Sequence, residues 1–208
     1  GWEAYEQPLS IVDERDFWTY ATNREAGYPP RSARDYMTMK FMRGYGEATE
    51  KLAHGDALGV IYVEDKEKDQ LNWLTVPREP GAEEPPTVYL VNLGMTSMNA
   101  PLNVRVLDTI GLATPLAARM PREEGGRVGH DKHLELEWQA ALTGADIEYL
   151  PPWYDKDKTR QARAALATPE VQELVASYSE PLTWERFRAN LAFSLTSGRT
   201  LMLPSDPS

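Results

Sequence analysis

The sequence predicts an α+β fold in which a small, mainly antiparallel sheet packs against several helices. The first observation is the apolar run at residues 88–93 (VYLVNL), which follows two prolines and stops at Gly94. A short apolar run bounded by helix-breaking residues is typical of a buried strand. The second observation is a pair of similar runs, LGVIYV at 58–63 and LNWLTV at 71–76. Their connections are too short for parallel crossovers, so an antiparallel meander over about residues 58–107 is expected.

Helical periodicity on both sides of this region is the third observation. After a short strand at 8–12, Asp13 is placed to cap a helix over 14–25. A second helix is expected over 32–53, with Met37, Phe41 and Tyr45 facing the core; Gly44 and Gly46 mark either a kink or a close contact between helix and sheet. The methionines of this helix are interpreted as core residues.

The second half of the chain is predicted to be mostly helical. Helices are expected at 115–120, 130–143, 157–166, 169–178 and 183–197, and short strands at 147–150 and 200–203. The sheet becomes mixed if the segment at Leu102, at Ile147 or at Thr200 joins it in parallel. We expect one domain over residues 1–208, with a sub-boundary at the Gly-rich linker 121–129.

Composition excludes several classes of function. The 208 residues include 32 acidic and 22 basic side chains, a formal net charge of −10 that disfavours nucleic acid and anionic membrane surfaces. The absence of cysteine excludes disulfides, zinc–thiolate sites, iron–sulfur clusters and thiol nucleophiles. The sequence contains no apolar run of 18 residues, so it does not predict a membrane-inserted helix. It also contains no motif that indicates a cofactor. The chain begins at Gly1, which we interpret as an exported or anchored protein trimmed at its N-terminus, or as a cloning remnant.

Two stretches are candidate binding sites. Pro152, Trp153, Tyr154 and Asp155 follow a predicted strand, and exposed aromatic residues are favoured anchors of protein interfaces. The alternative is a Trp that folds over the edge of the core. On the helix expected over 130–143, His130, His133 and Glu137 would share one face and offer two imidazoles and a carboxylate to a metal. The alternative there is a solvated first turn.

The loop at 94–99 offers one further hydroxyl, Ser97, without the Gly-x-Ser-x-Gly motif of a nucleophile elbow. Acidic charge, surplus Trp and Tyr and the lack of a catalytic motif favour a non-catalytic module that binds another protein with a basic surface, as an inhibitor, adaptor or accessory subunit. The rival hypothesis is an enzyme, a hydrolase that uses a metal at His130 and His133 or a serine at Ser97.

Overall fold

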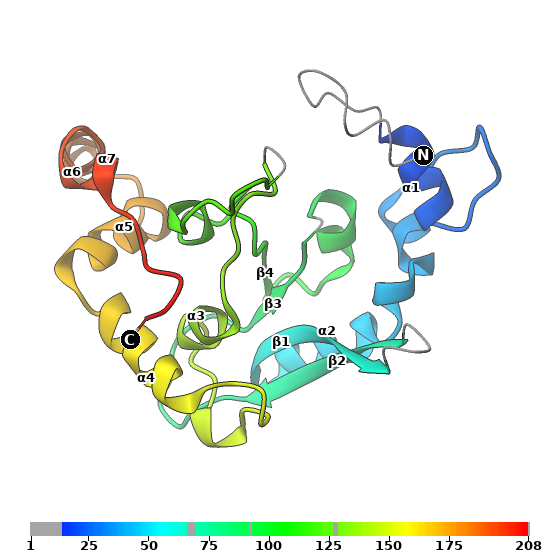
Figure 1. The fold of residues 1–208 in the computed structure, drawn as a ribbon, viewed down its shortest axis with the longest axis horizontal. Coiled ribbons are helices and arrows are strands. Elements are labelled where there is room, and N and C mark those ends of the chain that lie inside the picture. The colour runs from blue at the N-terminus through cyan, green and yellow to red at the C-terminus, as the bar shows by residue number, and fades with distance from the viewer. Residues whose placement is uncertain (1–13, 66–69, 92, 127–128, 208) are drawn as a thin grey trace. The chain divides into compact units, whose positions relative to one another are not determined.

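The computed structural model describes residues 14–65, 70–91, 93–126 and 129–207, so the strand predicted at 8–12 lies outside the described residues. Contacts divide the chain into two compact units, whose helices and strands are labelled in Figure 1. The first unit contains the described residues up to Arg78 together with Pro85–Leu107. The second unit contains Glu79–Glu84 and everything from Asp108 onward, including the linker 121–129.

The first unit is built on a four-stranded mixed sheet, which confirms the predicted α+β class. Its strands are β1 (Asp56–Asp65), β2 (Gln70–Pro77), β3 (Thr87–Tyr89) and β4 (Arg105–Leu107). The order is β2-β1-β3-β4. Strands β1 and β2 form the expected antiparallel hairpin, whereas β3 pairs in parallel with both β1 and β4.

The predicted meander is therefore wrong at its third strand. Strand β3 does run opposite to β2, as a short connection requires, but it pairs on the far side of β1. A short connection determines the direction in which the next strand runs, but it does not determine which strand that strand pairs with. The run at 88–93 is buried at Val88, Tyr89 and Leu90, whereas Val91 is 54% exposed, so the central strand is shorter than the apolar run.

The helix expected over 32–53 is broken into three pieces. These are η3 (Ala33–Thr38), η4 (Lys40–Met42) and α2 (Tyr45–His54). Gly44 precedes α2 with a φ of 79°, a left-handed conformation that a regular helix cannot contain. Helix α1 (Arg15–Ala21) lies further towards the N-terminus.

Helix α2 and the sheet share the core of the first unit. Tyr45 and Leu52 of α2 pack with Val88 and Leu90, and Met39 and Met42 belong to the same cluster, as predicted for the methionines. The Trp73 indole N–H donates a hydrogen bond of 2.7 Å to the Phe41 carbonyl and thereby ties β2 to the segment that precedes α2.

We predict that Gly59→Ala destabilises the first unit. A Cβ at Gly59 would lie 2.9 Å from Leu52 Cδ1 and 3.3 Å from Val88 Cγ2, and both neighbours are buried. Overpacking of this kind costs about 1–3 kcal/mol. The free energy of unfolding, measured with urea, should fall by that amount.

Gly46→Ala is the matched control. Gly46 lies in α2 with an ordinary backbone, and a Cβ added there would meet no neighbouring atom within 4 Å. Alanine at this position should be neutral or stabilising by up to about 1 kcal/mol, because glycine weakens a helix. Equal destabilisation by both substitutions would contradict the close approach of β1 to α2.

The second unit is helical. Its helices are α3 (Leu136–Ala141), α4 (Lys156–Leu166), α5 (Pro169–Ser179), α6 (Trp184–Leu195) and α7 (Ser197–Thr200), with 3-10 turns η6 (Ala117–Arg119) and η7 (Ile147–Tyr149). Helix α3 begins six residues later than predicted, and the strands expected at 147–150 and 200–203 are absent from this described region.

Trp138 of α3 is completely buried and anchors the C-terminal tail. Its indole N–H donates to the Pro204 carbonyl at 3.2 Å. The Leu203 amide donates to the Arg119 carbonyl at 2.9 Å, and the Leu203 side chain is buried. The tail is thus part of the packed structure up to Pro204.

Helix α6 packs through the buried side chain of Phe193 and through polar groups. Arg186 forms ion pairs of 2.8 Å with Glu173 and with Glu180, and Asn190 donates to the Ser177 carbonyl at 2.8 Å. An apolar stripe along α6 is nevertheless exposed. Its members are Trp184, Phe187, Leu191 and Leu195.

Asp108 opens the second unit with a fully buried carboxylate. Its two oxygens accept hydrogen bonds from five consecutive backbone amides, those of residues 110–114. Burial by itself would raise the pKa of Asp108, but hydrogen bonds from the amides of Ala113 and Leu112 and from the Thr114 hydroxyl hold it below its ordinary value.

We predict that Asp108→Asn costs about 2–3 kcal/mol of stability at neutral pH, because an amide nitrogen would face backbone donors. The folded-state pKa of Asp108 is lowered, so its contribution is present above the unfolded pKa and is lost as pH falls through the folded pKa. The stability difference between the two proteins should therefore shrink below about pH 4. Urea unfolding at pH 7 and pH 3 measures it, and a difference that does not change with pH would contradict the assignment.

Candidate functional site

A cleft of about 300 Å³ opens beside the N-terminal end of α4, within the second unit. We call it the Trp153 cleft. It is lined by Glu135, Glu137, Trp153, Asp155, Lys158, Ser205, Asp206 and Pro207. It combines one large aromatic ring with several charged groups, and its lining comes from α4, from the turn before α4, from the start of α3 and from the C-terminal tail.

Only part of the predicted aromatic stretch reaches this cleft. Trp153 is 51% exposed and lies in the turn that follows Pro151. Tyr154 is 5% exposed, so its place in the predicted binding surface is corrected: it packs inward, and its amide donates to the Pro151 carbonyl at 3.0 Å. Pro152 is exposed but does not line the cleft. Trp153 and Asp155 are the two predicted residues that do.

Asp155 caps helix α4. Its carboxylate accepts hydrogen bonds of 3.0 Å from the amides of Asp157 and Lys158, which are among the amides that a helix N-terminus leaves without internal partners. The Asp155 amide in turn donates to Glu137 Oε1 at 3.1 Å. Glu137 therefore fixes the turn that presents Trp153.

Lys158 connects α4 to the tail, with its ammonium 2.6 Å from the Asp206 carboxylate. The hydrogen bond to Asp206 raises the pKa of Lys158, and the charges of Asp206, Asp155 and Glu137 act in the same direction. The cleft holds four carboxylates and this one ammonium. Its formal charge is therefore strongly negative even with Lys158 protonated.

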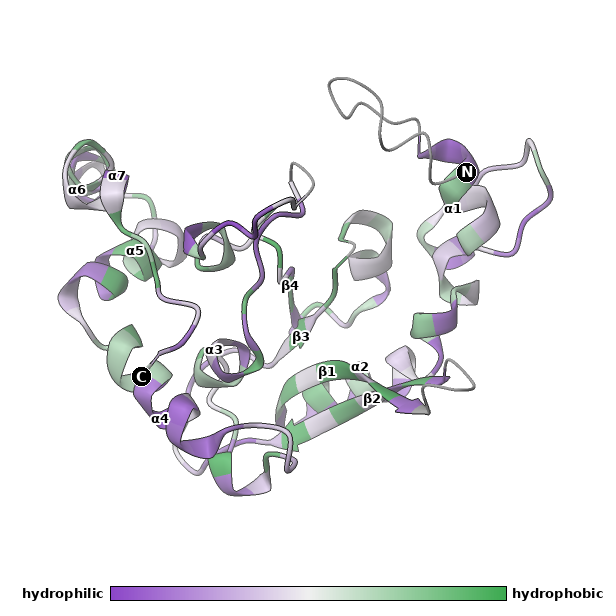
Figure 2. Cartoon of the chain, viewed as in Figure 1, coloured by the Kyte–Doolittle hydropathy of each residue, from purple (hydrophilic) through white to green (hydrophobic). Residues whose placement is uncertain are grey.

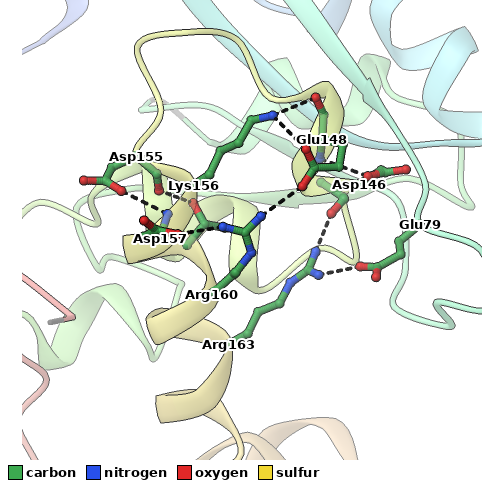
Figure 3. Close-up of polar contacts among 10 residues, drawn as sticks. Glu79, Asp146, Glu148, Asp155, Lys156, Asp157, Arg160 and Arg163 are labelled. Carbon is green, nitrogen blue, oxygen red and sulfur yellow. Dashed lines mark hydrogen bonds and ion pairs between the residues drawn. The ribbon is translucent and has the colours of Figure 1, made fainter.

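An exposed ion-pair network holds the first turns of α4 against η7 (Figure 3). Lys156 and Arg160 both contact the Glu148 carboxylate, at 3.2 and 2.9 Å, and Arg160 also pairs with Asp157 at 2.7 Å. The hydrogen bond from Lys156, assisted by Arg160, lowers the pKa of Glu148. A single exposed ion pair contributes little to stability, but in a network each ordered side chain serves more than one pair, so less side-chain entropy is lost per pair. Figure 2 shows α4 as a largely hydrophilic helix.

A larger hollow of about 720 Å³ lies between Glu79–Glu84 and helices α4 and α5. The guanidinium of Arg163 lies at this hollow and donates hydrogen bonds to the Glu79 carboxylate and the Ala145 carbonyl. The lining also includes aliphatic side chains such as Leu166 and Val175 and the polar side chain of Gln172. These contacts are structural, since they attach the 79–84 segment to the second unit.

The arrangement that suggested a metal site is not present. His130 and His133 precede α3 and are exposed, so they share no helical face with Glu137, whose carboxylate binds the Asp155 amide. Within the described ranges, no cluster of three or more His, Asp or Glu side chains has metal-binding geometry. Metal binding at His130, His133 and Glu137 stays a prediction that this geometry does not favour.

Ser97 lies in η5 (Gly94–Asn99) of the first unit. Its hydroxyl donates to the Gly94 carbonyl at 2.7 Å, an ordinary contact within a 3-10 turn. Its neighbour Asn99 donates to the Ala33 carbonyl at 2.8 Å and holds the turn against η3. A structural role accounts for this loop.

Sequence comparison identifies the family. The family model described as the AftB family C-terminal domain matches residues 38–208. This chain belongs to that family. Among the described helices of this AftB family member, none has the length and apolar character needed to cross a bilayer. No solved structure matches the chain.

Two curated relatives carry the same name. The chain is 47% identical over 205 residues to a terminal β-(1→2)-arabinofuranosyltransferase of Corynebacterium glutamicum, covering 95% of this chain and 30% of the relative. It is 33% identical over 198 residues to the enzyme of that name from Mycobacterium tuberculosis, covering 88% of this chain and 30% of the relative. The chain thus spans about a third of the length of these relatives.

These findings overturn the predicted function. The non-catalytic module that recognises a protein partner with a basic surface is wrong, because both of these curated relatives are named as arabinofuranosyltransferases. The rival hydrolase is not supported either, since the relatives are named as transferases. The negative charge was over-interpreted: it describes solubility and association, and it does not specify a protein ligand.

Sequence reasoning missed Glu135, Lys158 and Asp206 as members of the site. They come from separate segments of the second unit, and Lys158 and Asp206 meet across 48 residues of sequence. A local motif cannot show such a meeting. The one available signal was Asp155 three residues before Lys158, the spacing of a helix cap.

We predict different effects for two substitutions of Asp155. Asp155→Ala removes the cap of α4 and should cost about 1 kcal/mol. Asp155→Asn keeps a side-chain oxygen that can accept from the Asp157 and Lys158 amides, so stability should change by only a few tenths of a kcal/mol. Thermal unfolding monitored by circular dichroism compares the two, and equal losses would show that the charge rather than the cap stabilises the turn.

Proposed function

We propose that this chain acts within a terminal β-(1→2)-arabinofuranosyltransferase. The observation that carries the proposal is its 47% identity, over 95% of its length, to the corynebacterial enzyme of that name. In such a transfer the oxygen of an acceptor hydroxyl bonds to the anomeric carbon of the arabinofuranosyl group. The bond from that carbon to the donor's leaving group breaks, and the hydroxyl proton passes to a base.

The described part of the chain contributes recognition to this reaction in our proposal. A glycosyltransferase must bind an acceptor glycan as well as an activated donor, and binding energy at a distance from the reacting atoms can support catalysis. A concave surface with an exposed indole and fixed polar groups suits that role. The chain covers 30% of the length of the relatives, and the proposal assigns it recognition of the glycan and not the bond-forming step.

The proposal predicts that the enzyme containing this chain extends a glycan by one sugar. The purified enzyme is incubated with an activated arabinofuranosyl donor and an oligosaccharide that ends in arabinofuranose. Linkage analysis and NMR of the product should show a new terminal arabinofuranose in β-(1→2) linkage. Release of free arabinose alone, or transfer of another sugar in its place, would overturn the proposal.

A further inference from the structure

The Trp153 cleft has the chemistry of a carbohydrate site. Resting on the proposed function, we infer that it holds the arabinofuranose end of the acceptor glycan through the Trp153 ring and the surrounding carboxylates. Its volume of about 300 Å³ lies at the lower limit of roughly 300–1,000 Å³ for ligand pockets. The cleft is therefore sized for one or two sugar rings, and not for a long chain.

Trp153 supplies a flat surface for stacking. Trp153 is half exposed, and the turn that carries it is fixed by the capped end of α4 and by the Glu137–Asp155 contact. The face of an aromatic ring is electron-rich and attracts the weakly positive C–H groups on one face of a sugar. A ring whose backbone is already ordered loses little entropy when a ligand stacks on it.

The carboxylates supply hydrogen-bond acceptors. An ionised carboxylate accepts but cannot donate, and sugar hydroxyls are donors as well as acceptors. Asp206 and Lys158 are held in place by their ion pair, and Asp155 by its cap contacts, so their polar atoms are positioned before a ligand arrives. The Lys158 ammonium and the Ser205 hydroxyl add donors for sugar oxygens.

The charge of the cleft distinguishes the acceptor from the donor. Four carboxylates against one ammonium repel a sugar activated by a phosphate leaving group. A neutral glycan meets no such repulsion. The cleft therefore fits the acceptor side of the reaction better than the donor side.

A cation is the competing ligand, because carboxylates around a Trp face also bind ammonium groups. The Lys158 ammonium already neutralises one of the carboxylates, that of Asp206, which weakens the attraction for a second cation. The curated relatives are named as enzymes that transfer a sugar, so we favour the glycan as the ligand. Choline is the probe that would reveal the competing ligand.

The test is an NMR titration of the ¹⁵N-labelled 208-residue chain with a β-(1→2)-linked arabinofuranose disaccharide as its methyl glycoside. Amide shifts should change at Trp153, Asp155, Lys158 and Asp206. Trp153→Ala should weaken binding roughly tenfold or more, as loss of a stacking platform does. Asp155→Asn, which keeps the cap, should weaken it roughly threefold or more, because a charged acceptor is lost.

Trp184→Ala is the matched control, since Trp184 is also an exposed indole but lies on α6, outside the cleft. It should leave the affinity unchanged. Deletion of residues 205–208 should abolish binding without lowering the melting temperature, because the anchors at Leu203 and Pro204 remain. This variant separates loss of the cleft wall from loss of folding.

Three outcomes would overturn the inference: no amide shifts with the disaccharide, equal affinity for the Trp153→Ala and Trp184→Ala variants, or binding of choline in preference to the glycan. The proposed function has its own readout. Normal β-(1→2) transfer by an enzyme whose cleft fails to bind the disaccharide rejects the cleft and keeps the transferase. Binding in the cleft without any transfer rejects the transferase.

Discussion

The second unit depends on one buried indole. Trp138 fills the core beneath α3, and its N–H holds the Pro204 carbonyl, so one side chain both completes the packing and ties down the tail. The tail then supplies Ser205, Asp206 and Pro207 to the Trp153 cleft. A buried indole N–H without a hydrogen-bond acceptor would destabilise the folded state, so the hydrogen bond to Pro204 favours the packed position of the tail. The site is thus a consequence of how the core satisfies its polar atoms.

Cleft formation also uses the end of a helix. Asp155 satisfies the first amides of α4, and Glu137 satisfies the amide of Asp155. The two carboxylates therefore fix the turn in which Trp153 is exposed. The fold orders this turn without any ligand, as the proposed recognition surface requires. The ion pair between Lys158 and Asp206 links α4 to the C-terminal tail, which forms another part of the cleft wall.

The sequence predicts those features that are determined locally. Strands β1 and β2 and the approximate start of α4 follow from short-range patterns, and Gly44 lies where the helix predicted over 32–53 is interrupted. The neighbour of β3 and the exposure of the apolar side chains of α6 do not follow from such patterns, because both depend on contacts between distant segments. Of the predicted binding residues, Trp153 and Asp155 line the candidate cleft and Tyr154 packs inward, since hydropathy does not tell which of two adjacent aromatic residues turns inward.

The assignment of Glu79–Glu84 to the second unit affects how the protein can be divided. The chain leaves the first unit at Arg78, joins the second through Glu79 and Gly144, and returns at Pro85. No single cleavage of the backbone therefore yields both units intact. During synthesis, this short segment leaves the ribosome well before Gly144 and Arg163, so its contacts with them can form only after those residues have been made. Expression of either half alone would leave a six-residue gap in one unit or an orphaned loop in the other.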